Sequence, residues 1–213
     1  MARAGAELIA ARARDAVAAR GAFTFAVSGG HTPWAMFSHL VSLDVPWSSV
    51  TIYQVDERIA PDGDPDRNLT HLHESLGDVP ARVEAMPVED PDPEAGAARY
   101  GAALPERLDL VHLGLGPDGH TASLVPDDPV LDVTDRLVAL TLEYNGRRRM
   151  TLTYPALARA QGIVWLVTGA DKLDAMGKLL GGDRTIPAGR VEAGDSLILA
   201  DRAAVPADAT SSS

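Results

Sequence analysis

The sequence contains no cysteine and has far fewer basic than acidic side chains. Without cysteine there is no disulfide, no thiolate metal site and no cysteine nucleophile. The 19 lysines and arginines face 30 aspartates and glutamates, so the formal net charge is −11. A field of that sign repels a polyanion, and we therefore expect no nucleic-acid partner. It still permits a small anionic ligand held in a locally positive pocket.

Long apolar runs are also missing, because none approaches the ~20 residues that a membrane span requires. We therefore expect no membrane association. The first 21 residues are rich in arginine and alanine, as transit peptides are, but they include Glu7 and Asp15 and lead directly into an apolar strand. We interpret them as the first helix of a folded domain, and we expect a cytoplasmic protein.

What the sequence does contain is a regular alternation of apolar, β-rich runs with helical segments. Such alternation over 213 residues predicts one α/β domain with a mostly parallel sheet that helices cover on both faces. We expect this domain to span residues 1–204 and the remainder, 205–213, to be a disordered tail. The predicted strands cover residues 23–30, 49–57, 81–88, 109–116, 136–141, 149–153, 162–169 and 195–200.

The segments that follow four of these strands carry glycine or chemically active side chains. Ligands of open α/β sheets bind outside the carboxyl ends of the strands, so these segments predict the site. They cover residues 28–32, 56–58, 116–120 and 169–172.

The segment SGGHTP (28–33) lies between a strand and a helix. Its paired glycines would let an anion approach free backbone N–H groups at the start of the helix, as phosphate sites do. An ordinary tight strand-to-helix turn explains the same residues equally well. The GxxxxGK[ST] pattern of a P-loop is absent.

The segment GLGPDG (114–119) formally matches the dinucleotide fingerprint GxGxxG. We disfavour that interpretation, because Asp118 would face the pyrophosphate and because the fingerprint belongs to a first βα unit. An aspartate two residues before His120 can instead orient the imidazole for general-base catalysis. A histidine that is hydrogen-bonded for structure alone is the competing explanation.

No metal site is predicted. The acids at positions 62, 64 and 66 suggest a calcium loop, but its sixth position is Arg67 rather than glycine and its twelfth is His73 rather than glutamate. His71 and His73 are taken as surface residues. Arg149 and Lys172 are isolated cations that spacing alone does not bring together.

Five motifs in this order resemble the 6-phosphogluconolactonase family. They are SGGHTP, then DER (56–58) with Asn68 following, then LGLGPDGHTASLVP (113–126), RMTLT (149–153) and VTGADK (167–172). The resemblance runs from about residue 5 to residue 204. It implies an α/β/α, Rossmann-like fold shared with glucosamine-6-phosphate deaminases. It also implies hydrolysis of 6-phospho-D-glucono-1,5-lactone, the second step of the pentose phosphate pathway, without an organic cofactor.

The resemblance also suggests roles for individual residues. His120 would be the general base, oriented by Asp118, while Arg58, positioned by Asp56, would stabilise the oxyanion or bind the sugar phosphate. The remaining candidates would bind the phosphorylated substrate: Ser28, Gly29, Gly30, Thr32, Asn68, Arg149 and Lys172.

Two alternatives stay open at this point. Glucosamine-6-phosphate deaminases carry a catalytic glutamate five residues after the histidine of the DGH motif, and here that position is Val125, which cannot transfer a proton. The second alternative is a domain that binds sugar phosphates without catalysis. The presence of both Asp118 and His120 favours an enzyme over such a domain. The residue before Asn68 is Arg67, where the family usually has serine. We expect a monomer or a small homo-oligomer.

Overall fold

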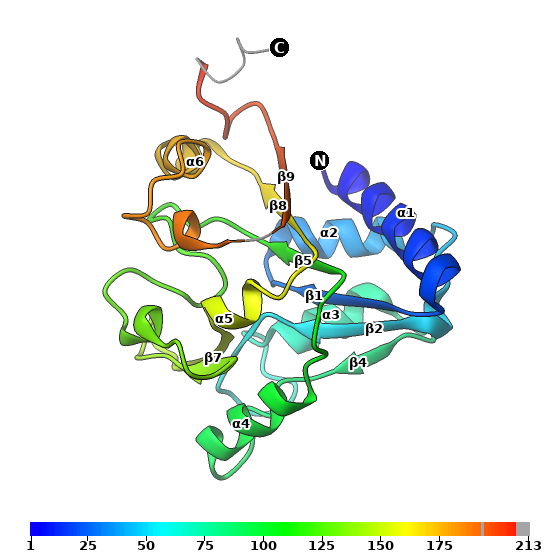
Figure 1. The fold of residues 1–213 in the computed structure, drawn as a ribbon, viewed down its shortest axis with the longest axis horizontal. Helices are drawn as coiled ribbons and strands as arrows, with labels where there is room; N and C mark the ends of the chain where they lie inside the picture. The colour runs from blue at the N-terminus through cyan, green and yellow to red at the C-terminus, as the bar shows by residue number, and fades with distance from the viewer. Residues whose placement is uncertain (193, 208–213) are drawn as a thin grey trace.

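The computed structural model describes residues 1–192 and 194–207, in which strands and helices alternate along most of the chain (Figure 1). The strands are β1 (Phe23–Val27), β2 (Val50–Gln54), β3 (Asp56–Arg58), β4 (Arg82–Glu84), β5 (Leu110–Leu113), β6 (Val138–Leu140), β7 (Arg149–Leu152), β8 (Gly162–Val167) and β9 (Asp195–Ala200). The helices are α1 (Ala2–Arg20), α2 (His31–Leu40), α3 (Asn68–Leu76), α4 (Pro93–Ala103), α5 (Tyr154–Leu157) and α6 (Leu173–Leu180).

Six strands form the central sheet, in the order β4-β2-β1-β5-β8-β9, and every neighbouring pair is parallel. The chain first builds outward from β1 through β2 to β4. It then returns to place β5 on the other side of β1. The strand order therefore reverses between β1 and β5, and this is where open α/β sheets form their ligand crevice.

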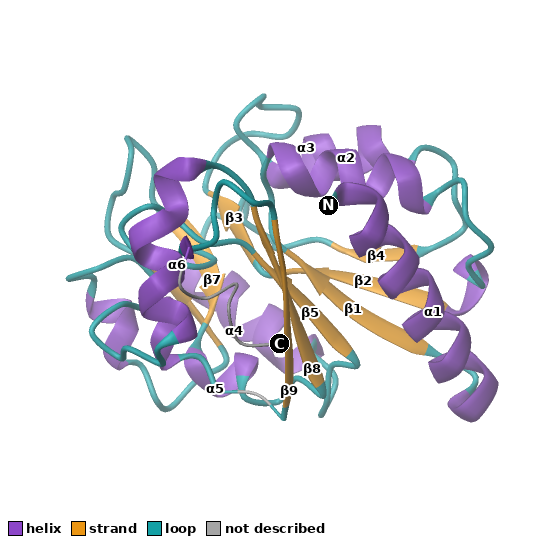
Figure 2. Ribbon diagram, turned by 90° about the horizontal axis from the view of Figure 1, so that it is seen from above, coloured by secondary structure: helices purple, strands orange, loops and turns teal. Residues whose placement is uncertain are grey.

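Alternate side chains of β1 enter two separate cores. Phe23, Phe25 and Val27 pack beneath α1, α2 and α3, whereas Ala26 belongs to the core on the opposite face. That second core includes side chains from α4, α5 and α6 (Figure 2). Burial of both faces is why the strands are continuous apolar runs, and each fully buried phenylalanine contributes about 1.5–3 kcal/mol. The three-layer α/β/α prediction is confirmed.

A second, three-stranded antiparallel sheet, in the order β3-β7-β6, was not expected. The predicted strand 49–57 is in fact two strands, which belong to different sheets and meet at Val55. The N–H of Val55 donates to the carbonyl of Val27, and the carbonyl of Val55 accepts from the N–H of Leu152. Val55 thus joins the two sheets, and residues 56–58 turn away from the parallel sheet into the antiparallel one.

Most of the predicted strands are longer than the observed ones, and the largest difference is at 81–88, where β4 covers only Arg82–Glu84. The helix that begins at Pro93 ends at Ala103, because Leu104 is extended (φ −63°, ψ 140°), the conformation that a residue before proline favours. Asp92 caps the start of this helix, and its carboxylate accepts from the N–H groups of Glu94 and Ala95.

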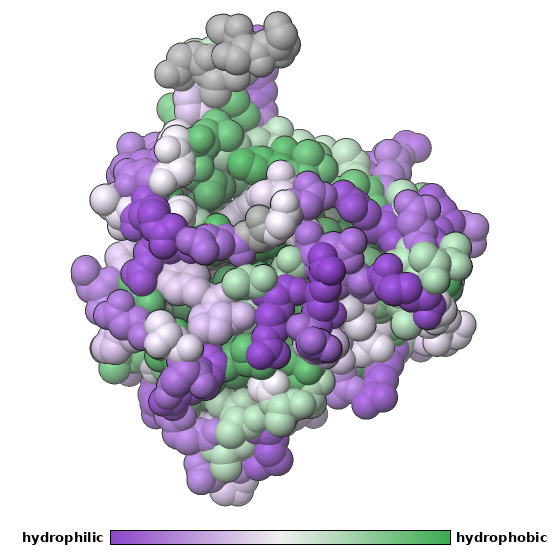
Figure 3. Space-filling model, in the orientation of Figure 1, coloured by the Kyte–Doolittle hydropathy of each residue, from purple (hydrophilic) through white to green (hydrophobic). Residues whose placement is uncertain are grey.

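On the face that Figure 3 shows, polar side chains predominate, and apolar side chains gather over the edge strand β9. There, Leu197 is 41% exposed. No helix among the described residues is long and apolar enough to cross a membrane. Of the expected tail, Val205 packs against the core, and residues 208–213 lie outside the described residues.

Candidate active site

A cleft of about 200 Å³ opens at the carboxyl ends of β1 and β5, where the strand order reverses. The segments after β1, β5 and β8 form one part of it, and the antiparallel sheet contributes residues from β3 and β7. The lining residues are Ser28, Gly29, Gly30, Asp56, Arg58, Asn68, Gly114, Leu115, Gly116, His120, Ala122, Arg149 and Lys172. Residues that lie up to 144 positions apart in the sequence therefore meet in one cavity.

The turn after β1 presents free polar groups to the cleft. Gly30 has a positive φ of 129° and caps α2, a helix of ten residues. A side chain at Gly29 would overlap the Asn68 amide, so only glycine allows α3 to approach this closely. The Ser28 hydroxyl is buried and has no hydrogen-bond partner among the described residues. This combination of an unused hydroxyl with a helix N-terminus favours an anion.

His120 and Asp118 lie in the turn after β5. The Nδ1 atom of His120 lies 2.5 Å from Oδ1 of Asp118, which also accepts the backbone N–H of His120 at 3.1 Å. Gly116 makes this arrangement possible, because a side chain there would overlap the imidazole. Asp118 itself does not line the cleft. It lies beside His120, which does.

The carboxylate of Asp118 is held in its charged form. Burial alone would raise the pKa of Asp118, but hydrogen bonds from the backbone and imidazole of His120, together with the charge of that ring, outweigh it. The pKa of Asp118 therefore lies below its ordinary value. A carboxylate that stays ionised fixes the proton of the imidazole on Nδ1 and leaves Nε2 free to accept another.

Arg58 and Arg149 lie directly opposite each other on β3 and β7. Like charges in that position repel, and among the described residues neither guanidinium has a carboxylate within ion-pair distance. Arg149 is 8% exposed, and burial lowers its pKa while the nearby Asp56 carboxylate opposes that shift. Its Nε has no hydrogen-bond partner in the described part of the chain. An anion bound between the two arginines would relieve their repulsion.

Asp56 is buried and holds its neighbours in place. Its Oδ2 accepts from the Ser123 hydroxyl at 2.7 Å, and its backbone carbonyl accepts from Nδ2 of Asn68 at 2.9 Å. The side-chain oxygen of Asn68 then accepts from Arg58. The Ser123 hydroxyl lies 3.5 Å from Nη1 of Arg149. Asp56 is thus linked to both arginines through one intermediate side chain each.

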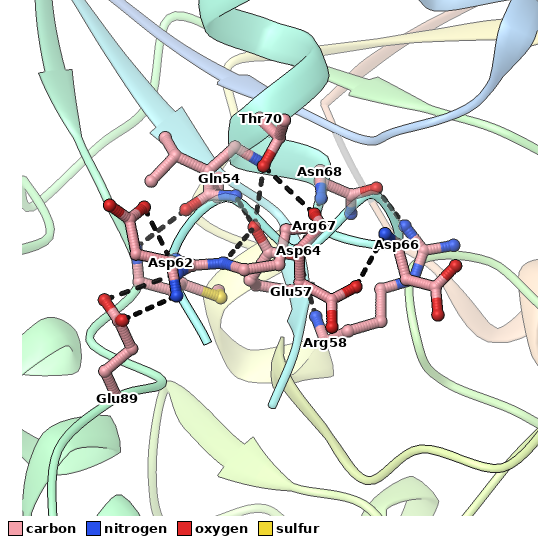
Figure 4. Close-up of polar contacts among 12 residues, drawn as sticks. Gln54, Glu57, Arg58, Asp62, Asp64, Asp66, Arg67, Asn68, Thr70 and Glu89 are labelled. Carbon is pink, nitrogen blue, oxygen red and sulfur yellow. Dashed lines mark hydrogen bonds and ion pairs between the residues drawn. The ribbon is translucent and has the colours of Figure 1, made fainter. Parts of the chain in front are cut away.

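Glu57, next to Asp56 in the chain, carries a carboxylate that is fully inaccessible to solvent. Figure 4 shows it among Gln54, Arg58 and Asn68. The carboxylate accepts backbone N–H groups from Arg58, Asn68 and Leu69 and the side-chain amide of Gln54, each at 2.8 Å. The guanidinium of Arg67, which is 2% exposed, lies 3.6 Å from it. Glu57 therefore anchors the first turn of α3, from which Asn68 reaches the cleft.

Lys172 completes the positive lining. It ends a short 3₁₀ turn, Ala170–Lys172, which follows Gly169 (φ 101°) at the end of β8. Its Nζ lies 2.8 Å from the exposed carboxylate of Asp171. With Arg58 and Arg149 it gives the cleft three cations, against the single lining carboxylate of Asp56. The cleft is thus positive in a chain of net charge −11.

Thr32 is the one predicted substrate-binding residue that the structure places elsewhere. Its hydroxyl lies 2.8 Å from that of Thr168 and links the start of α2 to the end of β8. It does not line the cleft. The described residues contain no group of three or more His, Asp or Glu side chains arranged to hold a metal ion.

Sequence reasoning did not single out Ser123 or Glu57 as part of the site, and it did not consider Tyr144, whose hydroxyl lies 3.3 Å from Oδ2 of Asp118. Ser123 stood within a recognised motif, and Glu57 lay between two recognised residues. The sequence did contain a signal near Tyr144. The next two residues, Asn145-Gly146, are the preferred pair of a two-residue hairpin turn, and they predict that Tyr144 begins such a turn. Both residues of that pair have positive φ, 53° and 76°.

Comparison with known proteins places this chain among sugar-phosphate enzymes. A 6-phosphogluconolactonase from Synechocystis sp. is 37% identical over 187 residues, covering 80% of this chain and 77% of that protein. The crystal structure of a 6-phosphogluconolactonase from Shewanella baltica superposes with a TM-score of 0.82 at 27% identity, covering 92% and 90% of the two chains.

A monomeric glucosamine-6-phosphate deaminase has the same fold, with a TM-score of 0.83 at 19% identity over 95% of this chain and 93% of its own. The fold alone therefore does not separate the two activities. Val125, at the position where deaminases carry their glutamate, is 5% exposed and apolar. Residues 1–199 match the family described as glucosamine-6-phosphate isomerases/6-phosphogluconolactonase, and the chain belongs to that family.

Proposed function

We propose that this chain hydrolyses 6-phospho-D-glucono-1,5-lactone to 6-phospho-D-gluconate, the second step of the oxidative pentose phosphate pathway. The observation that carries the proposal is that His120, hydrogen-bonded to Asp118 behind it, lines a cleft that also contains three cations. A hydrolytic base and an anion-binding lining are the two features that a phosphorylated lactone requires. The names of the relatives support the same substrate.

In the proposed mechanism His120 accepts a proton from a water molecule as the water oxygen attacks the lactone carbonyl carbon. The carbonyl oxygen becomes an oxyanion in a tetrahedral intermediate. The bond from this carbon to the ring oxygen then breaks, the carbonyl re-forms, and His120 returns its proton to the departing oxygen. Asp118 holds the ring in the tautomer that this sequence needs, and a base of this kind contributes ~10²–10⁴-fold.

The cations have two tasks in this scheme, which are to stabilise the oxyanion and to bind the phosphate. We assign the phosphate to the Ser28–Gly30 turn with Arg149 and Lys172, because the turn supplies N–H and hydroxyl donors and the cations supply charge. Arg58 is held by Asn68 and supplies positive charge to the oxyanion. The reaction has no redox step, and the carbonyl of a δ-lactone is already electrophilic, so the proposal includes no organic cofactor and no metal.

Deamination is disfavoured by Val125, because a buried valine supplies no proton-transfer group at that position. A non-catalytic binding domain would have no use for an aspartate that holds a histidine toward the cleft. We further propose that the enzyme works in the cytoplasm as a monomer or a small homo-oligomer, without a nucleic-acid partner.

The direct test is hydrolysis of freshly generated 6-phosphogluconolactone, followed by pH-stat against the spontaneous reaction. The proposal predicts a rate well above the uncatalysed one, and a purified, folded chain that binds 6-phosphogluconate without accelerating hydrolysis would refute it.

Substitution of Lys172 tests the assigned phosphate site. A charge-assisted hydrogen bond contributes ~1.5–3 kcal/mol, so Lys172→Ala is expected to raise KM for the phosphorylated lactone about tenfold or more. Hydrolysis of unphosphorylated gluconolactone should barely change. Lys178→Ala is the matched control, because Lys178 pairs with Asp174 on α6 and does not line the cleft. Equal losses on both substrates would move Lys172 from phosphate binding to the reaction centre.

A further inference from the structure

Tyr144 contacts three residues of the proposed site, although it does not line the cleft itself. Its hydroxyl donates to Oδ2 of Asp118 at 3.3 Å, so it bonds the carboxylate oxygen that His120 does not use. Its ring meets the His120 imidazole edge-to-face, with centroids 5.6 Å apart. The guanidinium carbon of Arg149 lies 5.2 Å from the centre of the same ring.

The backbone that presents Tyr144 is tightly constrained. Tyr144 and Arg147 form an isolated antiparallel bridge across Asn145-Gly146, in a hairpin between β6 and β7. Arg147 then ties the hairpin to the loop before α3, since its Nη2 lies 3.0 Å from Asp64 and 3.1 Å from Asp66. The tyrosine is therefore held at a fixed place beside Asp118 rather than on a free loop.

We propose that Tyr144 is a positioning residue for the reaction, acting through its hydroxyl on the Asp118–His120 pair and through its ring on Arg149. This inference rests on the proposed function. The hydroxyl bond fixes the second carboxylate oxygen of Asp118, so the carboxylate cannot rotate away from the imidazole. It also takes up part of the negative charge of the carboxylate that faces the His120 imidazole. The ring supports the guanidinium from one side by a cation–π contact.

The surroundings of Tyr144 strengthen the case that these contacts serve the site. Burial and the neighbouring Asp118 charge both raise the pKa of Tyr144, so its phenol stays protonated and can donate. The charged groups that line the cleft around the pair are Asp56, Arg58, Arg149 and Lys172. A second tyrosine, Tyr154, also donates a hydroxyl hydrogen bond and also has a guanidinium over its ring, but it lies away from the cleft and so offers a comparison.

Two substitutions separate the two tasks. Tyr144→Phe keeps the ring and removes the hydroxyl, so kcat should fall about fivefold while KM stays within about twofold. The acidic limb of the pH profile of kcat/KM should move upward by about half a unit, because His120 then faces a carboxylate with one donor fewer. Tyr144→Leu also removes the ring, and KM should rise about fivefold in addition.

Tyr154→Phe is the matched control. Tyr154 donates to the carbonyl of Pro187 at 2.9 Å, and the Arg190 guanidinium carbon lies 4.9 Å from its ring centre. Loss of this hydroxyl removes a comparable structural bond and should leave kcat and the pH profile unchanged. A Tyr144→Phe enzyme with wild-type kcat and an unmoved acidic limb would overturn the proposal. So would an identical change in Tyr154→Phe.

A measurement without turnover keeps this inference distinct from the proposed function. The imidazole of His120 is titrated by NMR in the wild type and in Tyr144→Phe, with His120→Gln used for assignment. The titration midpoint should move upward in Tyr144→Phe even if 6-phosphogluconolactone is not the substrate. An unchanged midpoint would reject the role of the Tyr144 hydroxyl, whereas an inactive wild type with a moved midpoint would reject only the proposed function.

Discussion

The substitution Glu57→Gln tests how much the buried carboxylate of Glu57 contributes to the stability of the protein. The two oxygens of Glu57 accept four hydrogen bonds, two at each oxygen. A glutamine in the same place keeps one oxygen and turns its amide N–H₂ toward two donors that then have no acceptor. Each unsatisfied buried donor costs about 1–3 kcal/mol.

The same substitution removes the charge that faces the buried guanidinium of Arg67. Breaking a buried ion pair from one side typically costs about 3–5 kcal/mol, and the lost hydrogen bonds are part of the same event. We therefore expect Glu57→Gln to lower the free energy of unfolding by about 3–5 kcal/mol. Because domains of this kind are stable by ~5–15 kcal/mol, the variant should still fold at low temperature.

Urea unfolding followed by circular dichroism measures this loss, and two further variants control for it. Glu89→Gln removes a half-exposed carboxylate that lies 3.3 Å from the same guanidinium, and it should cost less than about 1 kcal/mol. In Glu57→Gln the buried guanidinium of Arg67 keeps only the more exposed carboxylates of Asp62 and Glu89 as partners. The double variant Glu57→Gln/Arg67→Met removes that guanidinium and should recover at least about 1 kcal/mol relative to Glu57→Gln. A Glu57→Gln protein within about 1 kcal/mol of the wild type would refute the argument.

Two further predictions concern histidines with opposite surroundings. His120→Ala should lower kcat at least about 10²-fold in steady-state assays while 6-phosphogluconate binding, measured by calorimetry, survives; near-normal turnover would remove His120 from the mechanism. His112 is fully buried in β5, neither ring nitrogen has a partner among the described residues, and burial lowers its pKa to about 4. Its ordinary pKa is 6.5, so the unfolded chain binds the extra proton first as the pH falls. Stability should therefore drop between pH 6.5 and pH 4, by about 2 kcal/mol from pH 7 to pH 5, and unfolding curves of His112→Met should lack that component.

The position of the site could be predicted because it follows from the parallel sheet. Continuous apolar runs indicate strands buried on both faces, and parallel strands bring their carboxyl ends to one edge. Ser28 and His120 each follow such a strand, so their segments were expected to meet before any contact was known. The segment that ends in Lys172 was expected at the same edge, but spacing alone did not show that this cation joins Arg149 in one cavity. Thr32 shows the limit of this argument, since proximity to a strand end does not determine which way a side chain points.

The break at Val55 could not be predicted, and it determines the other half of the cleft. The run SVTIYQVDE contains no proline or glycine, and its residues 50–55 are mostly β-branched or aromatic, so no residue type marks a break at Val55. Only the tertiary hydrogen bonds of Val55 to two different sheets divide it. Arg58 therefore lies in an antiparallel strand, whereas the sequence pattern placed it just after a strand of the parallel sheet, and its register opposite Arg149 is a consequence of that division.

The two buried arginines of the described chain show how the site is held ready for an anion. Arg67 lies against Glu57, a carboxylate as deeply buried as itself, and this pair stabilises the first turn of α3. Arg149 has no carboxylate partner of this kind, and it faces Arg58 across the sheet. A guanidinium at this depth without an ion pair destabilises the free protein, because its remaining contacts replace its lost hydration only in part. The substrate phosphate or the oxyanion would supply the negative charge that Arg149 lacks. The ion pair with Arg149 would therefore form only on binding, and its free energy would contribute to binding rather than to folding.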